Sequence, residues 1–222
     1  MKKILATVFA ASLMLVGSQA YAQLVPGAGY LFASEASKSD SNKSEATPYH
    51  GFYVGASYNI PLAAGLGVAP GFYVDMLLHN TNTEGGSAVA GLTLMGSYRE
   101  VALNIPLNLT YSYEFGKDMA IRLFAGPVFQ YGVISKTTIN GTLSGSIFGI
   151  KYSYSDGASV NHYDAEDGSR NPFNIYLGGG LGFQVGDILF TVGYDHNLLD
   201  IDKYDGVTTN RNQIKAGINF AF

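Results

Sequence analysis

Apolar and polar residues alternate along the last segment of the chain, up to its final residue. The apolar positions are Ile214, Ala216, Ile218, Phe220 and Phe222, whereas the alternate positions Gln213, Lys215, Gly217 and Asn219 are polar or glycine. A period of two gives a β-strand one apolar face and one polar face. A chain that ends on such a strand needs a neighbouring strand for it to pair with. A β-barrel that closes on itself in a membrane supplies that neighbour and an apolar surrounding.

The same period recurs in seven earlier segments. It is clearest from 101 to 115, where the odd positions are apolar or aromatic and most even positions are polar. No helix of period 3.6 gives this pattern. We expect an irregularity at Pro106, because proline cannot donate to a ladder. The pattern predicts strands near or above the ~9–11 residues of a tilted membrane strand, at about 24–34, 49–60, 67–79, 99–115, 119–136, 172–186, 188–198 and 211–222.

The connections between these segments alternate in length. The short ones lie near 61–66, 116–118 and 187. The long ones, rich in Ser, Asn, Asp and Gly, lie at 35–48, 80–98, 137–171 and 199–210. Short periplasmic turns and long outside loops are typical of outer-membrane barrels, and an even number of strands places both termini on the periplasmic side. The fold class is therefore an all-β, transmembrane, antiparallel up-and-down barrel of about eight strands.

Two alternatives to this interpretation stay open. Asn140-Gly141 is a strong hairpin signal, and 147–154 resembles a strand. We interpret 137–171 as a hairpin that rises above the membrane, but ten strands remain possible if a further strand lies within 84–97. A soluble, lipocalin-like barrel is the rival fold, and it would turn the apolar residues inward.

Composition and the first residues indicate an exported membrane protein. Charged residues make up only 14% of the chain, which has 28 Gly and 16 Tyr. The net charge of -4 argues against nucleic acid as a partner, because phosphate binding needs basic patches. A basic start, an apolar stretch over 4–16 and the sequence Ala20-Tyr21-Ala22 indicate a cleaved signal peptide at 1–22. The barrel domain is then 23–222.

The interior of an eight-stranded barrel is just wide enough to be filled by side chains. Charges enclosed there need partners, and Glu114 and Arg122, which flank a tight turn on adjacent strands, are expected to pair diagonally. We expect Gly178-Gly179-Gly180 to make room for large inward side chains such as Tyr176. We predict that the inward polar residues form a structural network that fills the lumen. The alternative is that the same residues line a narrow ion path. They are Asp75, Glu114, Arg122, Gln130, Gln184, Asp195 and Lys215.

The long loops hold weaker candidates for chemistry. Ser159, His162 and Asp164 are close in sequence, but a catalytic triad is defined by geometry, and no G-x-S-x-G motif is present. The acidic run from Asp200 to Asp205 misses the spacing of a calcium loop. We therefore expect no enzyme activity, no metal site and no cofactor. Cation bridging between these acidic loops and lipopolysaccharide phosphates is a further hypothesis.

Three stretches resemble a known family. They are Tyr98-Arg99-Glu100-Val101-Ala102-Leu103-Asn104-Ile105-Pro106-Leu107, Leu123-Phe124-Ala125-Gly126-Pro127 and the terminal Phe222. The chain resembles the outer-membrane β-barrel domain family, often called porin family proteins, which includes small OmpA/OmpX-type barrels. The resemblance implies a barrel in the outer membrane of a Gram-negative cell, with Phe222 as the signal for the barrel-assembly machinery.

These features together predict a monomeric outer-membrane protein with a structural or surface-interaction role. The expected partners are outer-membrane lipid or lipopolysaccharide, the assembly machinery, and an unidentified surface ligand bound by the long loops. A narrow small-solute or ion channel is the alternative function. A barrel enzyme that modifies lipid A is the third.

Removal of Phe222 should impair insertion into the outer membrane while leaving export intact, because the residue is predicted to act in assembly and not in secretion. Cell fractionation with a heat-modifiability gel checks this. Loss of the protein from the periplasm as well as from the membrane would contradict it.

Overall fold

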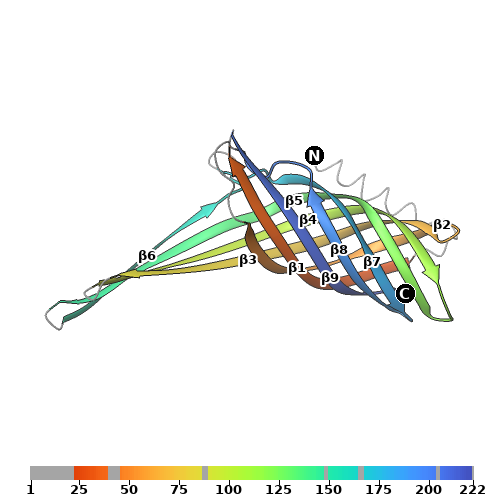
Figure 1. Ribbon diagram of the computed structural model, residues 1–222, viewed down its shortest axis with the longest axis horizontal. Coiled ribbons are helices and arrows are strands. Elements are labelled where there is room, and N and C mark those ends of the chain that lie inside the picture. The colour runs from red at the N-terminus through yellow and green to blue at the C-terminus, as the bar shows by residue number, and fades with distance from the viewer. Residues whose placement is uncertain are drawn as a thin grey trace.

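The computed structural model describes residues 23–39, 46–86, 90–147, 150–164, 168–203 and 206–221 (Figure 1). The signal peptide expected at 1–22 and the terminal Phe222 lie outside the described residues. No helix within these ranges is long and apolar enough to cross a membrane. The strands are β1 (Gln23–Ser39), β2 (Thr47–Ala63), β3 (Leu66–Gly86), β4 (Ala90–Glu114), β5 (Met119–Ile147), β6 (Ile150–Asn161), β7 (Phe173–Val185), β8 (Ile188–Asn197) and β9 (Val207–Phe220).

Eight of these strands form a closed antiparallel ring. The order β4-β3-β2-β1-β9-β8-β7-β5 is completed by a β4–β5 pairing, while β6 pairs with β5 alone. The predicted pairing of the last segment with the first is confirmed, since β1 and β9 pair from Gly27 opposite Asn219 to Ser39 opposite Val207. The eight-stranded prediction therefore holds for the ring.

Short turns gather at one end of the barrel, which we call the turn end. They span 64–65, 115–118 and 186–187. Gly65, Gly116 and Gly186 have positive φ angles there, a conformation that glycine adopts without a steric cost. The first residue of β1, Gln23, lies opposite Asn59 at this end. The last residues of β9 also lie there, as predicted for an even-stranded barrel.

Apolar side chains cover the outside of the barrel. On β4, Leu109 is 56% exposed, whereas its neighbour Thr110 is 5% exposed and faces the lumen. The same contrast holds along β7, β8 and β9. The lipocalin-like alternative, with apolar residues inside, is therefore wrong. The interior still holds a small apolar cluster, formed by Leu31, Ala33, Tyr49, Tyr53, Leu77 and Tyr98.

Pro106 disturbs the ladder as predicted. The β3–β4 register skips 105–106, and the β4–β5 register skips 107–108. The strand itself continues through the proline, because the register is the same on both sides of the gap between β3 and β4.

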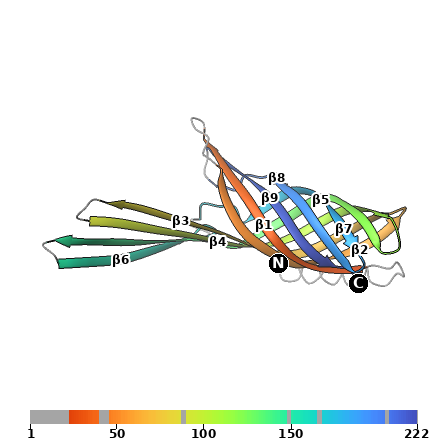
Figure 2. The same ribbon diagram turned by 60° about the horizontal axis from the view of Figure 1, so that its bottom comes forward.

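Four strands continue beyond the barrel as a flat extension (Figure 2). We call it the projecting sheet, formed by 79–86 of β3, 90–98 of β4, 136–147 of β5 and 150–161 of β6. The expected hairpin at 137–171 is confirmed in β5 and β6. Two details were wrong. Within the segment expected as a loop at 80–98, residues 80–86 and 90–98 pair as strands, and Asn140-Gly141 lies within β5 and does not form the turn.

The apolar face changes sides where the projecting sheet begins. In β4 the outward residues Val101 and Leu103 give way to Leu92 and Leu94, which share the face of the lumen-facing Tyr98. In β5 the apolar residues stay at odd positions, but a bulge at Val133 reverses the face that odd positions occupy. Both strands thus move their apolar side chains away from the outer wall.

A charged substitution on each side of this change tests the boundary. Leu107→Arg, on the lipid-facing wall midway along β4, should destabilise the folded barrel by about 2–4 kcal/mol. Leu94→Arg, on the projecting sheet, should change stability by no more than about 0.5 kcal/mol. Urea unfolding in lipid vesicles, followed by circular dichroism, measures both. Equal effects of the two substitutions would contradict the boundary.

Candidate functional site

A cluster of four charged residues crosses the lumen at the end away from the turns. We call it the ion-pair cluster: Glu35 of β1, Glu100 of β4, Arg211 of β9 and Arg170 of the β6–β7 connection. Arg211 donates two hydrogen bonds to Glu100, of 2.6 and 2.8 Å, and its Nη2 lies 2.9 Å from Glu35. Arg170 donates to the other oxygen of Glu35 at 2.6 Å. Two cations and two carboxylates therefore neutralise each other.

Burial makes this cluster depend on its internal bonds. Arg211 and Glu100 are each 1% exposed, and Glu35 is 6% exposed. Tyr98 adds a hydroxyl that donates to Glu100 and accepts from Arg170 at 3.0 Å. Its ring also lies beneath the Arg170 guanidinium, 5.2 Å from ring centre to carbon. Charges this buried are tolerated only with such complete pairing.

The sequence pattern did not predict this cluster, although three of its four residues lie within or directly beside predicted strands. Glu35 follows the inward positions of the strand predicted at 24–34, one residue beyond its predicted end. Glu100 lies at an inward position within the strand predicted at 99–115. Arg211 is the first residue of the last predicted strand and shares its parity with Lys215. Arg170 belongs to a connection without a period, so no sequence signal marked it.

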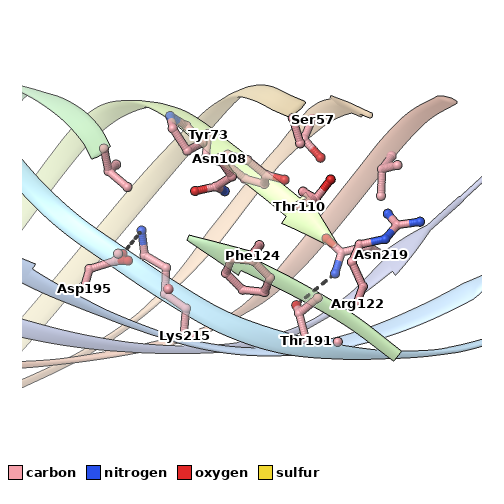
Figure 3. A pocket seen from close by; sticks show the side chains of 18 of the residues that line it. Ser57, Tyr73, Asn108, Thr110, Arg122, Phe124, Thr191, Asp195, Lys215 and Asn219 are labelled. Atoms are coloured by element: carbon pink, nitrogen blue, oxygen red, sulfur yellow. Dashed lines mark hydrogen bonds and ion pairs between the residues drawn. The ribbon is translucent and has the colours of Figure 1, made fainter. Parts of the chain in front are cut away.

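A second cluster lies deeper in the lumen, around Lys215 of β9 (Figure 3). The Lys215 ammonium lies 3.1 Å from Asp75 of β3 and 3.2 Å from Asp195 of β8. The three predicted lumen residues are thus brought together across the barrel. One cation faces two carboxylates, so the group carries a net charge of -1 when all three are ionised.

The remaining predicted lumen residues form separate contacts. Gln130 donates to Asn104 at 2.9 Å and accepts from Tyr176. Arg122 donates to Gln184 at 3.2 Å. Its expected diagonal ion pair with Glu114 is not present among the described residues, although the register places the two on adjacent rows, because the Arg122 guanidinium binds Gln184 of β7 instead. Glu114 instead lies exposed at the turn end.

Glycines of the inner wall make room for large side chains from other strands. A Cβ at Gly180 would meet the ring of Phe124, and one at Gly178 would meet the carboxylate of Asp195. The glycine run therefore makes room for inward side chains as predicted, but these side chains are Phe124 and Asp195 and not Tyr176. The missing side chain at Gly180 thus leaves the space that the Phe124 ring occupies in the lumen.

The turn-end half of the lumen is hollow. A cavity of about 130 Å³ lies beside Lys215, and a wider one of about 560 Å³ opens at the turns. Arg122 lines both. Within the described residues, Asn104 Nδ2 and Arg122 Nε have no hydrogen-bond partner. Unpaired buried polar atoms beside a space of this size are suited to binding ordered water.

The loop residues considered for catalysis do not assemble into a triad. His162 Nε2 lies 2.7 Å from the Thr137 hydroxyl, and its Nδ1 lies 2.9 Å from the Ser169 hydroxyl. Both ring nitrogens are thereby occupied by hydroxyls other than Ser159. Burial and the nearby Arg170 lower the pKa of His162, so the ring is neutral at pH 7.

The acidic loop before β9 uses its carboxylates to hold its own backbone. Asp200 accepts from the amides of Asp202 and Thr209, at 3.0 and 2.9 Å. Asp202 accepts from the Thr209 hydroxyl. In the described part of the chain, no group of three acidic or histidine side chains is arranged to hold a metal ion. Asp205 lies outside the described residues.

The projecting sheet presents an exposed apolar face. Its members lie on the face that continues the lumen side of the strands, and they are Leu92, Leu94, Ile139, Leu143, Tyr154 and Val160. Leu92, Leu143 and Tyr154 stand side by side in one row across three strands. The opposite face is mainly Ser, Thr and Asn. We call these six residues the apolar face.

Both edges of the projecting sheet are open in the described residues. β6 pairs with β5 alone, and β3 beyond Leu78 pairs with β4 alone. An open strand edge offers unpaired backbone donors and acceptors to another chain.

A closed antiparallel ring with an apolar outer wall and a polar lumen defines the class: a membrane-spanning β-barrel. The model of the family described as outer membrane protein beta-barrel domain matches residues 17–203. The chain belongs to this family, and the family places it in the bacterial outer membrane, in contact with membrane lipid. The comparison with curated protein sequences finds no match.

Solved structures of other small barrels are similar to this chain at low identity. The attachment invasion locus protein Ail of Yersinia pestis is 14% identical, with a TM-score of 0.34, covering 89% of this chain and 99% of that one. Neisserial surface protein A is 12% identical, with a TM-score of 0.35, covering 90% and 97%. The outer membrane protease OmpT of Escherichia coli is 9% identical, with a TM-score of 0.33, covering 92% and 98%. Likenesses at these TM-scores carry no argument about activity.

Loss of Arg211 should destabilise the barrel strongly. Arg211→Gln leaves Glu35 and Glu100 buried with Arg170 as their one cation, and breaking a buried ion pair in this way costs about 3–5 kcal/mol. Arg122→Gln is the control, because it removes a lumen cation that forms one hydrogen bond to a neutral side chain. Urea unfolding in detergent compares the two. Equal losses of stability would show that the ion-pair cluster has no special role.

Proposed function

We propose that this protein is a surface-interaction protein in which the barrel is the membrane anchor and the projecting sheet is the binding element. The observation that carries the proposal is the change of apolar face. The barrel places apolar residues outward for lipid, but the projecting sheet places them on the opposite face. Lipid contact therefore does not account for the apolar face.

The partner that best fits this sheet is an extended segment of another protein. A contiguous apolar patch with a polar rim is typical of a protein-binding surface. An open edge at β6 can pair with an incoming strand. A strand added there would place every second side chain beside Tyr154, Asp156, Ala158 and Val160. The partner segment should therefore alternate apolar and polar residues, with a polar or basic residue beside Asp156 on its otherwise apolar face.

The lumen supports an anchoring role for the barrel. The ion-pair cluster links β1, β4 and β9 across its outer end through bonds of 2.6 to 3.1 Å. A continuous ion path would require these bonds to break, so the narrow channel is not our proposal. The proposal is also non-enzymatic, because the hydrogen bonds of His162 go to Thr137 and Ser169 and leave no base for Ser159.

The route to the membrane forms part of the same proposal. The signal peptide at 1–22 would direct export across the inner membrane of a Gram-negative cell. The barrel-assembly machinery would then recognise the terminal Phe222.

A displayed library of random peptides tests the binding role. Peptides selected on the detergent-refolded protein should alternate apolar and polar residues. Leu94→Asn combined with Ile139→Asn should weaken their binding by about tenfold, equivalent to about 1.4 kcal/mol. Met95→Asn is the matched control, because Met95 is an exposed apolar residue on the opposite face of β4.

Two outcomes would contradict the proposal. One is a selected set of peptides without alternation. The other is equal binding of the selected peptides to the double variant, the Met95 variant and the unchanged protein.

A further inference from the structure

Two basic residues stand directly opposite each other on the outer wall. Arg99 of β4 faces Lys136 of β5 in the strand register, and both side chains are exposed. Within the described residues, neither forms an ion pair or a side-chain hydrogen bond. Side chains opposite each other in a sheet are about 5 Å apart at Cβ, and like charges placed there are destabilising. The pair therefore costs stability unless an anion lies between its members.

The pair marks the border between the apolar wall and the polar sheet. The next row toward the turn end is apolar and consists of Met76, Val101 and Ile134. The row on the other side offers hydroxyl and amide groups, from Asn80, Ser97, Thr138 and Ser159. Successive rows on one face are about 7 Å apart, so both rows lie within reach of a group held between Arg99 and Lys136.

The electrostatic surroundings on this face also favour an anion. Among the described side chains of β3 to β6, the acidic residue on this face is Glu84, six residues beyond Leu78 along β3. At about 3.3 Å per residue that is about 20 Å away. Glu100 is adjacent in sequence to Arg99 but points into the lumen, where it binds Arg211.

We propose that Arg99 and Lys136 bind the phosphate group of a lipid in the outer leaflet of the membrane. The apolar row contacts the acyl chains, the two cations hold the phosphate, and the hydroxyl row binds its remaining oxygens or the adjoining sugar. A guanidinium and an ammonium side by side supply charge-assisted hydrogen bonds to phosphate oxygens. The site is separate from the apolar face of the projecting sheet, so a failure of either proposal leaves the other standing.

Native mass spectrometry of the refolded barrel with diphosphoryl lipid A tests the site. Arg99→Gln combined with Lys136→Gln should lower lipid A binding by at least about tenfold, as expected from the loss of charge-assisted hydrogen bonds. Lys38→Gln combined with Lys203→Gln removes the same charge from exposed positions outside the site and should leave binding unchanged. Dephosphorylated lipid A should bind the unchanged protein and the Arg99/Lys136 variant equally weakly.

Two additional measurements distinguish a lipid site from misfolding and from a site for free phosphate. Lys136→Arg keeps the charge and should retain binding, and heat-modifiable gel migration of the Arg99/Lys136 variant excludes misfolding as the cause of its loss. Inorganic phosphate should not displace lipid A at equal concentration, because it lacks the acyl chains. Equal binding by the Arg99/Lys136 variant, or displacement by inorganic phosphate at equal concentration, would overturn the proposal.

Discussion

The backbone ladder between β1 and β9 is the contact on which the rest of the structure depends. Inside lipid, no water is present to satisfy an open strand edge, so every backbone donor and acceptor must be bonded within the sheet. The ladder from Gly27 to Ser39 removes both edges of the ring at once. It also places Glu35 directly opposite Arg211, so the seam that closes the barrel supplies half of the ion-pair cluster.

Closure then determines what the lumen can hold. Residues far apart in sequence are brought to one level, where their charges must neutralise each other because so little water reaches them. The outer end is filled by charged pairs, and the middle by Phe124 and the Lys215 group. The turn-end half keeps space and polar atoms suited to water. The lumen is therefore filled more closely at its outer end than at the turn end.

Beyond the membrane, the same strands meet a different requirement. There an apolar outer wall has no lipid to contact, and the apolar residues of both β4 and β5 lie on the other face. In β4 the apolar residues change from odd to even positions. In β5 they stay at odd positions, and the bulge at Val133 reverses the face that these positions occupy. Arg99 and Lys136 lie where this change occurs, which is the level at which we propose that they bind a lipid phosphate. The two proposals concern opposite sides of this border.

The sequence alone predicted about eight strands, with ten as an open alternative, and it determined their lipid-facing sides and the inward direction of Asp75, Lys215 and Asp195. These follow from a period of two, which is a local property. Only the tertiary structure decided which inward residues meet, because that depends on register and closure between distant strands. Arg170 reached the cluster from a connection without a period. Residues 80–86 and 90–98 were not predicted as strands, because they lack a clear apolar pattern. They pair as strands because the hydrogen bonds between them satisfy their backbone donors and acceptors.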